Sequence, residues 1–306
     1  MNPYLLLAMG VGLAGLGGDL FLRGLVGSAR WLRVSPAIMG ATVAAFATSS
    51  PELAVAIISA TSHHPGISLG NVLGANVVNL AVVLGLALLI APIPSRREEV
   101  GRDFTGALLV PAVLGLLAFD GRLSRLDGII LLALFGGWLA TVVRDARRER
   151  KHADPIPSVR PVPFVLAAGV GGLAALFAGG RLIVSGATAI ALQFGVPDFV
   201  IGATVVAVGT TVPELATTLI AQLRGHHQIG LGTVLGSNIF NSLFIVGLAA
   251  TLSPIPTAGR PIPISLAAGF LAAALVFPGR TGFLTRRRGA LLLTLYAAYL
   301  TIILQN

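Results

Sequence analysis

The residues most able to do chemistry are two glutamates that stand in long, apolar and otherwise uncharged stretches. Glu52 comes directly before 43 consecutive residues without Asp, Glu, Lys or Arg, and Glu214 comes shortly before a second such run of 35. A carboxylate inside a membrane span is costly unless it faces a cavity or a partner, so each glutamate is a candidate for function. The structural alternative is a salt bridge or a protonated glutamate packed between helices, but no Lys or Arg accompanies either residue.

Oxygen-bearing residues accompany both glutamates at matching positions. Two hydroxyl residues stand three and four positions before each glutamate, on the same helix face. A proline directly before each glutamate would break the helix and free backbone carbonyls, and an asparagine follows each glutamate by 27 positions. These hard oxygens favour Ca²⁺ or small monovalent cations over softer transition metals. The set comprises Thr48, Ser49, Asn79, Thr210, Thr211 and Asn241, with the carbonyls of Ala45 and Ala207.

The two glutamates occupy equivalent places in an internal repeat. Shifting the sequence by 162 positions aligns residues 40–79 with residues 202–241 without a gap, and 20 of the 40 positions are identical. Each half of the chain holds about five apolar spans, an odd number, so the second copy must enter the membrane upside down. Secondary transporters use this inverted-repeat plan, and their sites lie near midplane where two repeats meet. The repeat therefore predicts that the glutamates and asparagines converge at one depth.

The composition places these residues in a membrane protein. Of 306 residues, 55% are hydrophobic and 11% are charged, against about 25% charged in soluble domains, and the mean hydropathy is +0.89. We therefore expect an all-α polytopic membrane protein and exclude a soluble enzyme. The net charge of +9 reflects basic loops between spans rather than a nucleic-acid partner. The absence of cysteine excludes disulfides and iron–sulfur ligation.

Charged and proline-rich breaks predict ten transmembrane helices arranged as two inverted five-helix repeats. The spans cover roughly residues 4–28, 35–61, 67–91, 104–119, 126–143, 162–192, 198–222, 229–252, 261–278 and 289–305. The loops on one side carry 16 Lys and Arg against 3 on the other, which predicts cytoplasmic basic loops and both termini outside. We expect a first repeat over 1–143, a basic cytoplasmic linker over 144–161 and a second repeat over 162–306.

Other polar residues within the spans have simpler explanations. Asp19 and Arg23 stand four positions apart, which predicts an ion pair on one helix. Arg181 occupies the position equivalent to Asp19 in the repeat, so a pairing between helices or a place at the mouth of an ion path stays open. The histidines are expected in solvated loops, with pH modulation as the alternative: His63, His64, His226 and His227.

At these residues the sequence resembles the cation/calcium exchanger superfamily, the sodium/calcium antiporters with two inverted α-repeats. The matching motifs are FATSSPE (Phe46–Glu52) with GNVLGANVVN (Gly70–Asn79), and VGTTVPE (Val208–Glu214) with GTVLGSNIFN (Gly232–Asn241). The resemblance covers essentially the whole chain. It implies that both glutamates bind cations and that the first and sixth spans slide across a core of the second, third, seventh and eighth. It also implies further ligands, namely Thr48, Ser49, Asn79, Thr210, Thr211, Ser237 and Asn241.

Two positions depart from the pattern of that superfamily. Many sodium/calcium members have Ser where this chain has Ala75, and Asp where it has Asn241. Without that carboxylate, the two ionised glutamates give the site a formal charge of −2, which balances one Ca²⁺ or two monovalent ions. We therefore expect an altered stoichiometry or coupling ion.

Three functions are open on the sequence. The first is exchange of Ca²⁺ for Na⁺ by alternating access, with a Ca²⁺/H⁺ variant in which the two glutamates carry protons. The second is a passive cation channel with an acidic constriction. The third is an intramembrane enzyme, for which a metal triad, a Ser/His pair and an Asp-rich motif are all lacking. The inverted repeat and the proline-broken helices favour the antiporter, in a prokaryotic inner (cell) membrane. Such a protein needs cations and lipid but no cofactor, and no obligate protein partner is evident.

Overall fold

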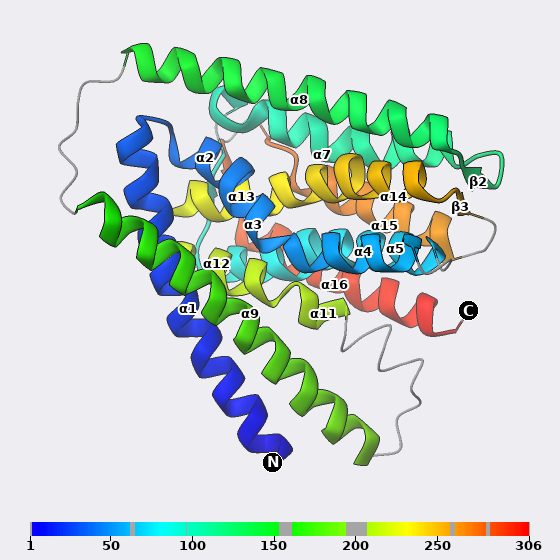
Figure 1. Ribbon diagram of the computed structural model, residues 1–306, viewed down its shortest axis with the longest axis horizontal. Coiled ribbons are helices and arrows are strands. Elements are labelled where there is room, and N and C mark those ends of the chain that lie inside the picture. The colour runs from blue at the N-terminus through cyan, green and yellow to red at the C-terminus, as the bar shows by residue number, and fades with distance from the viewer. Residues whose placement is uncertain are drawn as a thin grey trace.

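The computed structural model describes residues 2–61, 65–95, 97–152, 161–193, 207–257, 261–279 and 282–305, and these residues are almost entirely helical (Figure 1). Within them, six helices are long and apolar enough to cross a membrane, and a pair of shorter helices bent by 44° makes a seventh. The six are Pro3–Leu32, Ser68–Ile90, Arg125–Arg150, Val162–Gly186, His227–Leu252 and Arg286–Leu304. The predicted helical membrane class is confirmed, whereas the count of ten spans stays a prediction.

Several helices of the first half of the chain are interrupted by short π-helical segments or breaks. In order they are α1 (Pro3–Leu32), α2 (Pro36–Met39), η1 (Gly40–Ala44), α3 (Ala45–Thr48), α4 (Ser50–Thr61), α5 (Pro65–Val77), η2 (Val78–Val83), α6 (Leu84–Ile90), β1 (Ile93–Pro94), α7 (Arg97–Leu117), β2 (Arg122–Leu123) and α8 (Arg125–His152). The segments η1 and η2 are π-helical. The α8 helix continues into the basic segment as far as His152, and residues 153–160 lie outside the described part.

The second half repeats this pattern. Its elements are α9 (Val162–Gln193), α11 (Ala207–Thr210), α12 (Val212–Leu223), α13 (His227–Ile239), η4 (Phe240–Ile245), α14 (Val246–Leu252), β3 (Ile255–Pro256), α15 (Pro261–Val276), β4 (Phe283–Leu284) and α16 (Arg286–Leu304). A shift of 162 residues carries α3, α4, α5, η2, α6 and β1 onto α11, α12, α13, η4, α14 and β3 without an offset at any boundary. The sequence repeat is therefore a repeat of backbone geometry, including its π-helical turns.

Two short antiparallel strand pairs join the halves. β1 pairs with β4, and β2 pairs with β3. The pairing is extended by backbone bonds from Ser95 N to Gly282 O (2.8 Å) and from Thr257 N to Gly121 O (2.9 Å). Each pair therefore ties a loop of the first half to a loop of the second.

The α1 and α9 helices form a long antiparallel pair that crosses the rest of the bundle diagonally (Figure 1). Small residues allow the two backbones to approach closely. A Cβ atom added to Gly17 would lie 2.8 Å from the Leu176 amide nitrogen, and one added to Gly24 would lie 2.5 Å from the Gly169 Cα. Because these contacts leave no room for side chains, α1 and α9 are held together as a unit.

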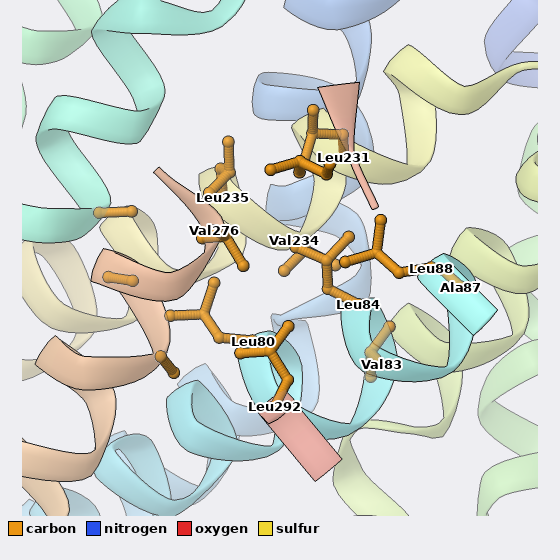
Figure 2. Packing of buried hydrophobic residues seen from close by; sticks show 14 of the residues in the cluster. Leu80, Val83, Leu84, Ala87, Leu88, Leu231, Val234, Leu235, Val276 and Leu292 are labelled. Atoms are coloured by element: carbon orange, nitrogen blue, oxygen red, sulfur yellow. The ribbon is translucent and has the colours of Figure 1, made fainter. Parts of the chain in front are cut away.

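The largest apolar cluster lies between the two repeats (Figure 2). Leu80, Leu84 and Leu88 from the η2–α6 segment pack against Leu231 and Leu235 of α13. Val276 and Leu292 bring α15 and α16 onto the same cluster. The close packing of these leucines resists deformation. The segments that carry the asparagines are therefore positioned by a rigid core.

The outer surface is apolar, as expected of a protein in lipid. Leu116 is 76% exposed and Phe119 is 90% exposed, and large side chains exposed to this degree would be a liability in water. Many of the buried polar residues lie instead on α4, α5, α12 and α13 and in the π-helical segments η2 and η4. The fold thus has an apolar surface and encloses a group of polar side chains beside its apolar clusters.

Candidate cation site

Two helix breaks place both glutamates at the start of a new helix. The first break falls at Ser49 (φ −85°, ψ 11°), between α3 and α4, and the second at Thr211 (φ −87°, ψ 4°), between α11 and α12. Pro51 and Pro213 stand in the first turn, where the missing backbone donor costs little. Glu52 and Glu214 follow in that turn, where the partial positive charge of the helix end favours a carboxylate. The predicted proline breaks are confirmed.

The expected freeing of the Ala45 carbonyl is not what the structure shows. Ala45 O accepts the Ser49 amide at 3.0 Å and the Thr48 hydroxyl at 3.4 Å. The helix turns away only at Ser49, one turn after Ala45, so this carbonyl stays within helical hydrogen bonding. Ala207 is the first residue of α11, and residues 194–206 before it lie outside the described part.

Glu214 is fully buried and receives hydroxyl groups from two other helices. Ser49 Oγ donates to Glu214 Oε1 at 2.9 Å, and Ser237 Oγ reaches the same oxygen at 3.4 Å. The Thr48 hydroxyl instead donates to the Ala44 carbonyl at 2.9 Å. Thr48 and Ser49 were expected on the face of Glu52, but Ser49 binds the glutamate of the other repeat, because α3 and α12 pack against each other.

Glu52 is equally buried but has a poorer hydrogen-bond environment. Neither of its carboxylate oxygens meets a donor at hydrogen-bond geometry within the described part of the chain. The Glu214 charge and the Thr210 hydroxyl both act on it, so the two glutamates lie within electrostatic reach of each other. Thr211 instead donates to Val208 O at 2.8 Å. The side-chain hydrogen bond from Ser49 to Glu214 crosses between the repeats, and Glu52 has no counterpart to it among the described residues.

The two asparagines of the predicted site lie in the π-helical segments η2 and η4. Such widened turns recur at functional sites because they redirect side chains and backbone groups. Asn79 is fully buried, and neither atom of its amide group has a hydrogen-bond partner among the described residues. Asn241 donates through Nδ2 to Asn76 Oδ1 at 3.1 Å and leaves its own Oδ1 without a donor.

A polar network that the sequence analysis did not assign to the site holds Asn241 in place. Asn76 Nδ2 donates to Ser242 Oγ at 2.6 Å, and Asn238 Nδ2 donates to the Asn76 carbonyl at 3.0 Å. Asn76 and Asn238 are matched in the repeat, which was a usable signal. Ser242 has Leu80 at its equivalent position, so nothing in the repeat pointed to it.

The arrangement leaves several buried oxygen atoms without hydrogen-bond donors in the described residues. They are Glu52 Oε1 and Oε2, Glu214 Oε2, Asn79 Oδ1, Asn238 Oδ1 and Asn241 Oδ1. A buried acceptor without a partner carries its full desolvation cost, and a hard cation is the partner that such oxygens suit. The ion pairs found within the described residues involve neither glutamate, and no cluster of three or more His, Cys, Asp or Glu occurs there.

A cavity of about 510 Å³ leads to the helix breaks. Pro51, Pro213 and Thr210 line it on the side of the glutamates, and Arg181 and Ser185 of α9 line the opposite wall. Arg181 has no acidic partner in the described part of the chain. The sequence left open a pairing between helices or a place at the mouth of an ion path for Arg181. The structure places Arg181 in the wall of the cavity.

The repeat relates the α9–α4 side, where this cavity lies, to the contact between α1 and α12, and that contact is closed. α1 packs along α12, whereas α9 makes little contact with α4 among the described residues. The predicted Asp19–Arg23 pair is present at 2.6 Å, and Asp19 also binds Arg224, the residue after α12, at 2.7 Å. This cavity therefore lies on the α9 side of the glutamates.

The histidines lie away from the cation site where they are described. His226 is the residue before α13, and His227 Nδ1 lies 2.8 Å from Gln222 Oε1. His63 and His64 fall outside the described residues.

Comparison with known proteins identifies this arrangement. A family model for the sodium/calcium exchanger protein matches residues 2–144 and 164–305. The chain belongs to the sodium/calcium exchanger family. The match leaves out residues 145–163, which include the last part of α8 and the basic segment after it.

Relatives of this family member include transporters from bacteria and archaea. The putative antiporter CaxA of Alkalimonas amylolytica is 34% identical over 92% of each chain, and the sodium/calcium exchanger MaX1 of Methanosarcina acetivorans is 27% identical over 98% of each chain. Among solved structures, the sodium-calcium exchanger NCX_Mj soaked with Na⁺ and Ca²⁺ is 31% identical, with a TM-score of 0.83 over 98% of this chain and 97% of that one. These relatives are named as a putative antiporter and as exchangers, and the chain is a member of this family of cation antiporters.

Proposed function

We propose that the chain exchanges Ca²⁺ for Na⁺ across a cell membrane, with both ions bound in turn between Glu52 and Glu214. The observation that carries this proposal is the set of buried oxygens without donors at two helix breaks that share one cavity. Asn79 and Asn241 supply amide oxygens, and Thr210 supplies a hydroxyl at the cavity wall. Ser49 and Ser237 orient the Glu214 carboxylate, whereas the Thr48 and Thr211 hydroxyls donate to backbone carbonyls beside the breaks.

The charge of the site sets the expected exchange ratio. Two ionised glutamates balance one Ca²⁺ or two Na⁺, and the neutral Asn241 adds an oxygen ligand without adding charge. A third Na⁺ would leave an excess positive charge in a low-dielectric environment. We therefore propose fewer than three Na⁺ per Ca²⁺.

The architecture we propose has ten spans in two inverted halves, residues 1–143 and 162–306, linked by residues 144–161. It is supported by the exact repetition of helix boundaries at a distance of 162 residues and by the equivalence of the β1·β4 and β3·β2 pairs. With the basic loops in the cytoplasm, both termini lie outside and the cavity beside α9 opens outward. Movement of the α1–α9 unit across the other helices would close that cavity and open the opposite side.

Exchange of Ca²⁺ for protons is the second candidate. It is favoured by one observation, the absence of a donor or a basic partner at the buried Glu52 carboxylate among the described residues. Protonation would neutralise both glutamates once Ca²⁺ has left, and it would do so without a second metal ion. In this scheme Asn241 still supplies an oxygen ligand without charge.

The test is isotopic Ca²⁺ uptake into proteoliposomes that contain the purified protein. An outward Na⁺ gradient is compared with an outward H⁺ gradient, and liposomes without either gradient are the control. Uptake driven by Na⁺ alone supports the proposal, and uptake driven by H⁺ alone establishes the second candidate in its place. Current that flows without any counter-ion gradient would overturn both and favour a channel.

A further inference from the structure

A second cavity is lined by none of the proposed cation ligands. It has a volume of about 450 Å³ and lies between the second half of α1, the start of α9 and the turn after α12. Its polar wall consists of Asp19, Arg23, Arg30, Arg224 and His226. This concentration of basic groups in one cavity is not explained by cation exchange, because a positive wall repels Ca²⁺ and Na⁺.

The wall holds more positive than negative charge. Its one carboxylate, that of Asp19, is shared by Arg23 at 2.6 Å and Arg224 at 2.7 Å. Arg30 has no acidic partner within the described residues. Burial, together with the charges of Arg30 and His227, lowers the pKa of His226, so the cavity already disfavours a further positive charge. An anion would be stabilised there.

The position of the cavity suits an amphiphilic anion. α1 ends at Leu32, α9 begins at Val162 and α12 ends at Leu223, so the cavity lies where three helices leave the apolar layer. Beside the arginines it is lined by Val26 and by Phe164, which is 47% exposed. Basic pockets at this level of a membrane protein hold anionic headgroups. Guanidinium groups also match pairs of phosphate oxygens in geometry.

We propose that this cavity binds the phosphate of an anionic phospholipid, with the headgroup at Arg30 and Arg224 and an acyl chain along Val26 and Phe164. Arg30 belongs to α1 and Arg224 follows α12, so one phosphate group joins these two elements beside the start of α9. The bound lipid thereby reinforces the link that the Asp19–Arg224 ion pair already makes. The inference does not depend on the proposed exchange activity.

Native mass spectrometry of the purified full chain in a neutral detergent tests this binding directly. Phosphatidylglycerol and phosphatidylcholine are offered at equal concentration, and preferential retention of phosphatidylglycerol is expected. Arg30→Gln should weaken phosphatidylglycerol binding about fivefold, as expected for one arginine near an anionic headgroup. Arg30→Lys should recover most of the binding, since it keeps the charge. Arg287→Gln, which removes an exposed arginine at the start of α16, is the matched control and should leave binding unchanged.

The other outcomes of this experiment each support or overturn the proposed lipid site. Equal retention of the two lipids, or equal loss of binding in the Arg287→Gln control, would overturn the proposal. Displacement of phosphatidylglycerol by inorganic phosphate at matched concentration would show that a free phosphate is the ligand and would overturn the role of the acyl chain. Thermal midpoints measured without lipid check that each variant is folded, so a loss of binding in a folded Arg30→Gln protein supports the site.

Discussion

The two halves of the cation site have the same backbone but different hydrogen bonding. Glu214 Oε1 meets the Ser49 and Ser237 hydroxyls, whereas neither oxygen of Glu52 meets a donor in the described part of the chain. One cause is visible in the repeat, because the position equivalent to Ser237 is Ala75. A second cause is that Thr211, the residue equivalent to Ser49, donates to Val208 O and not to a glutamate. Glu214 is therefore hydrogen-bonded by protein hydroxyls, whereas Glu52 is left for a cation.

The asparagines differ in the same way. Asn241 is anchored to Asn76, which Ser242 holds in turn, while Asn79 has no anchor among the described residues because Leu80 replaces the serine. The duplicated fold thus gives both halves of the site the same backbone. A few substitutions make the half with Glu214 preorganised by hydrogen bonds and the half with Glu52 adaptable. An exchanger gains from this inequality, because ions of different charge and size must bind in the same place.

The largest expected effect comes from removing either carboxylate. Glu52→Gln and Glu214→Gln should each lower Ca²⁺ uptake about 100-fold or more, because a buried site with half its charge no longer offsets the dehydration of Ca²⁺. The two variants should differ in stability. Glu52→Gln removes a buried carboxylate that has no donor and should raise the thermal midpoint of the cation-free protein by about 2–4 °C, whereas Glu214→Gln should not. Wild-type uptake in either variant would remove these residues from the site.

Replacing each of the two asparagines with alanine should separate the loss of a cation ligand from the loss of the hydrogen bond that anchors Asn241. Asn79→Ala should weaken Ca²⁺ affinity about tenfold with little loss of stability, since its amide group has no partner to leave behind. Asn241→Ala should weaken affinity and also lower the free energy of unfolding by about 1–2 kcal/mol, because Asn76 loses a buried donor. Calcium binding and denaturant unfolding measure the two effects. Equal destabilisation by both variants would contradict the proposed inequality.

Restoring an acid at position 241 should change the coupling ion preference. Asn241→Asp adds a carboxylate beside Asn76, whose amide can turn to donate to it while Ser242 donates to Asn76. The added charge should strengthen the Na⁺ dependence of Ca²⁺ uptake about fivefold. The comparison is made in proteoliposomes over a range of Na⁺ gradients, with the unsubstituted protein as the control. An unchanged Na⁺ dependence would count against the charge argument.

Neutralising the arginine in the cavity wall should improve cation binding. Arg181→Gln removes an unpaired positive charge from the path to the glutamates and should raise Ca²⁺ affinity about threefold, with a smaller effect on Na⁺ because the repulsion scales with ion charge. The gain should shrink at high ionic strength. Asp19 and Arg23 lie on α1 at the closed contact, so Arg23→Gln is the control. Reduced affinity in Arg181→Gln would show that this arginine supports the site instead.

The smallest effect is expected from making the half-sites alike. Ala75→Ser places a hydroxyl at the position equivalent to Ser237 and should give Glu52 a donor. Because Ala75 is fully buried, the extra oxygen should cost little stability only if it finds this partner. We expect about a twofold change in Ca²⁺ affinity and an unchanged thermal midpoint. A loss of several degrees would mean that the added hydroxyl stays unpaired.

The sequence by itself determined the membrane class, the repeat and the helix breaks. Uncharged runs of apolar residues have few alternatives to a membrane, and a proline before each glutamate favours the first turn of a new helix over a helix interior. The same local rule predicted the Asp19–Arg23 pair, because residues four apart on one helix are neighbours.

Only the tertiary structure decided which residues face each other across elements. Periodicity placed Ser49 on the face of Glu52, yet Ser49 binds Glu214, and Arg224 joins Asp19 from a helix about 200 residues away. It also decided that the cavity lies beside α9 while α1 closes against α12. Helical spacing determines which residues share one face of a helix. The partner of each face depends on how distant elements pack, and packing acts between residues that sequence spacing does not relate.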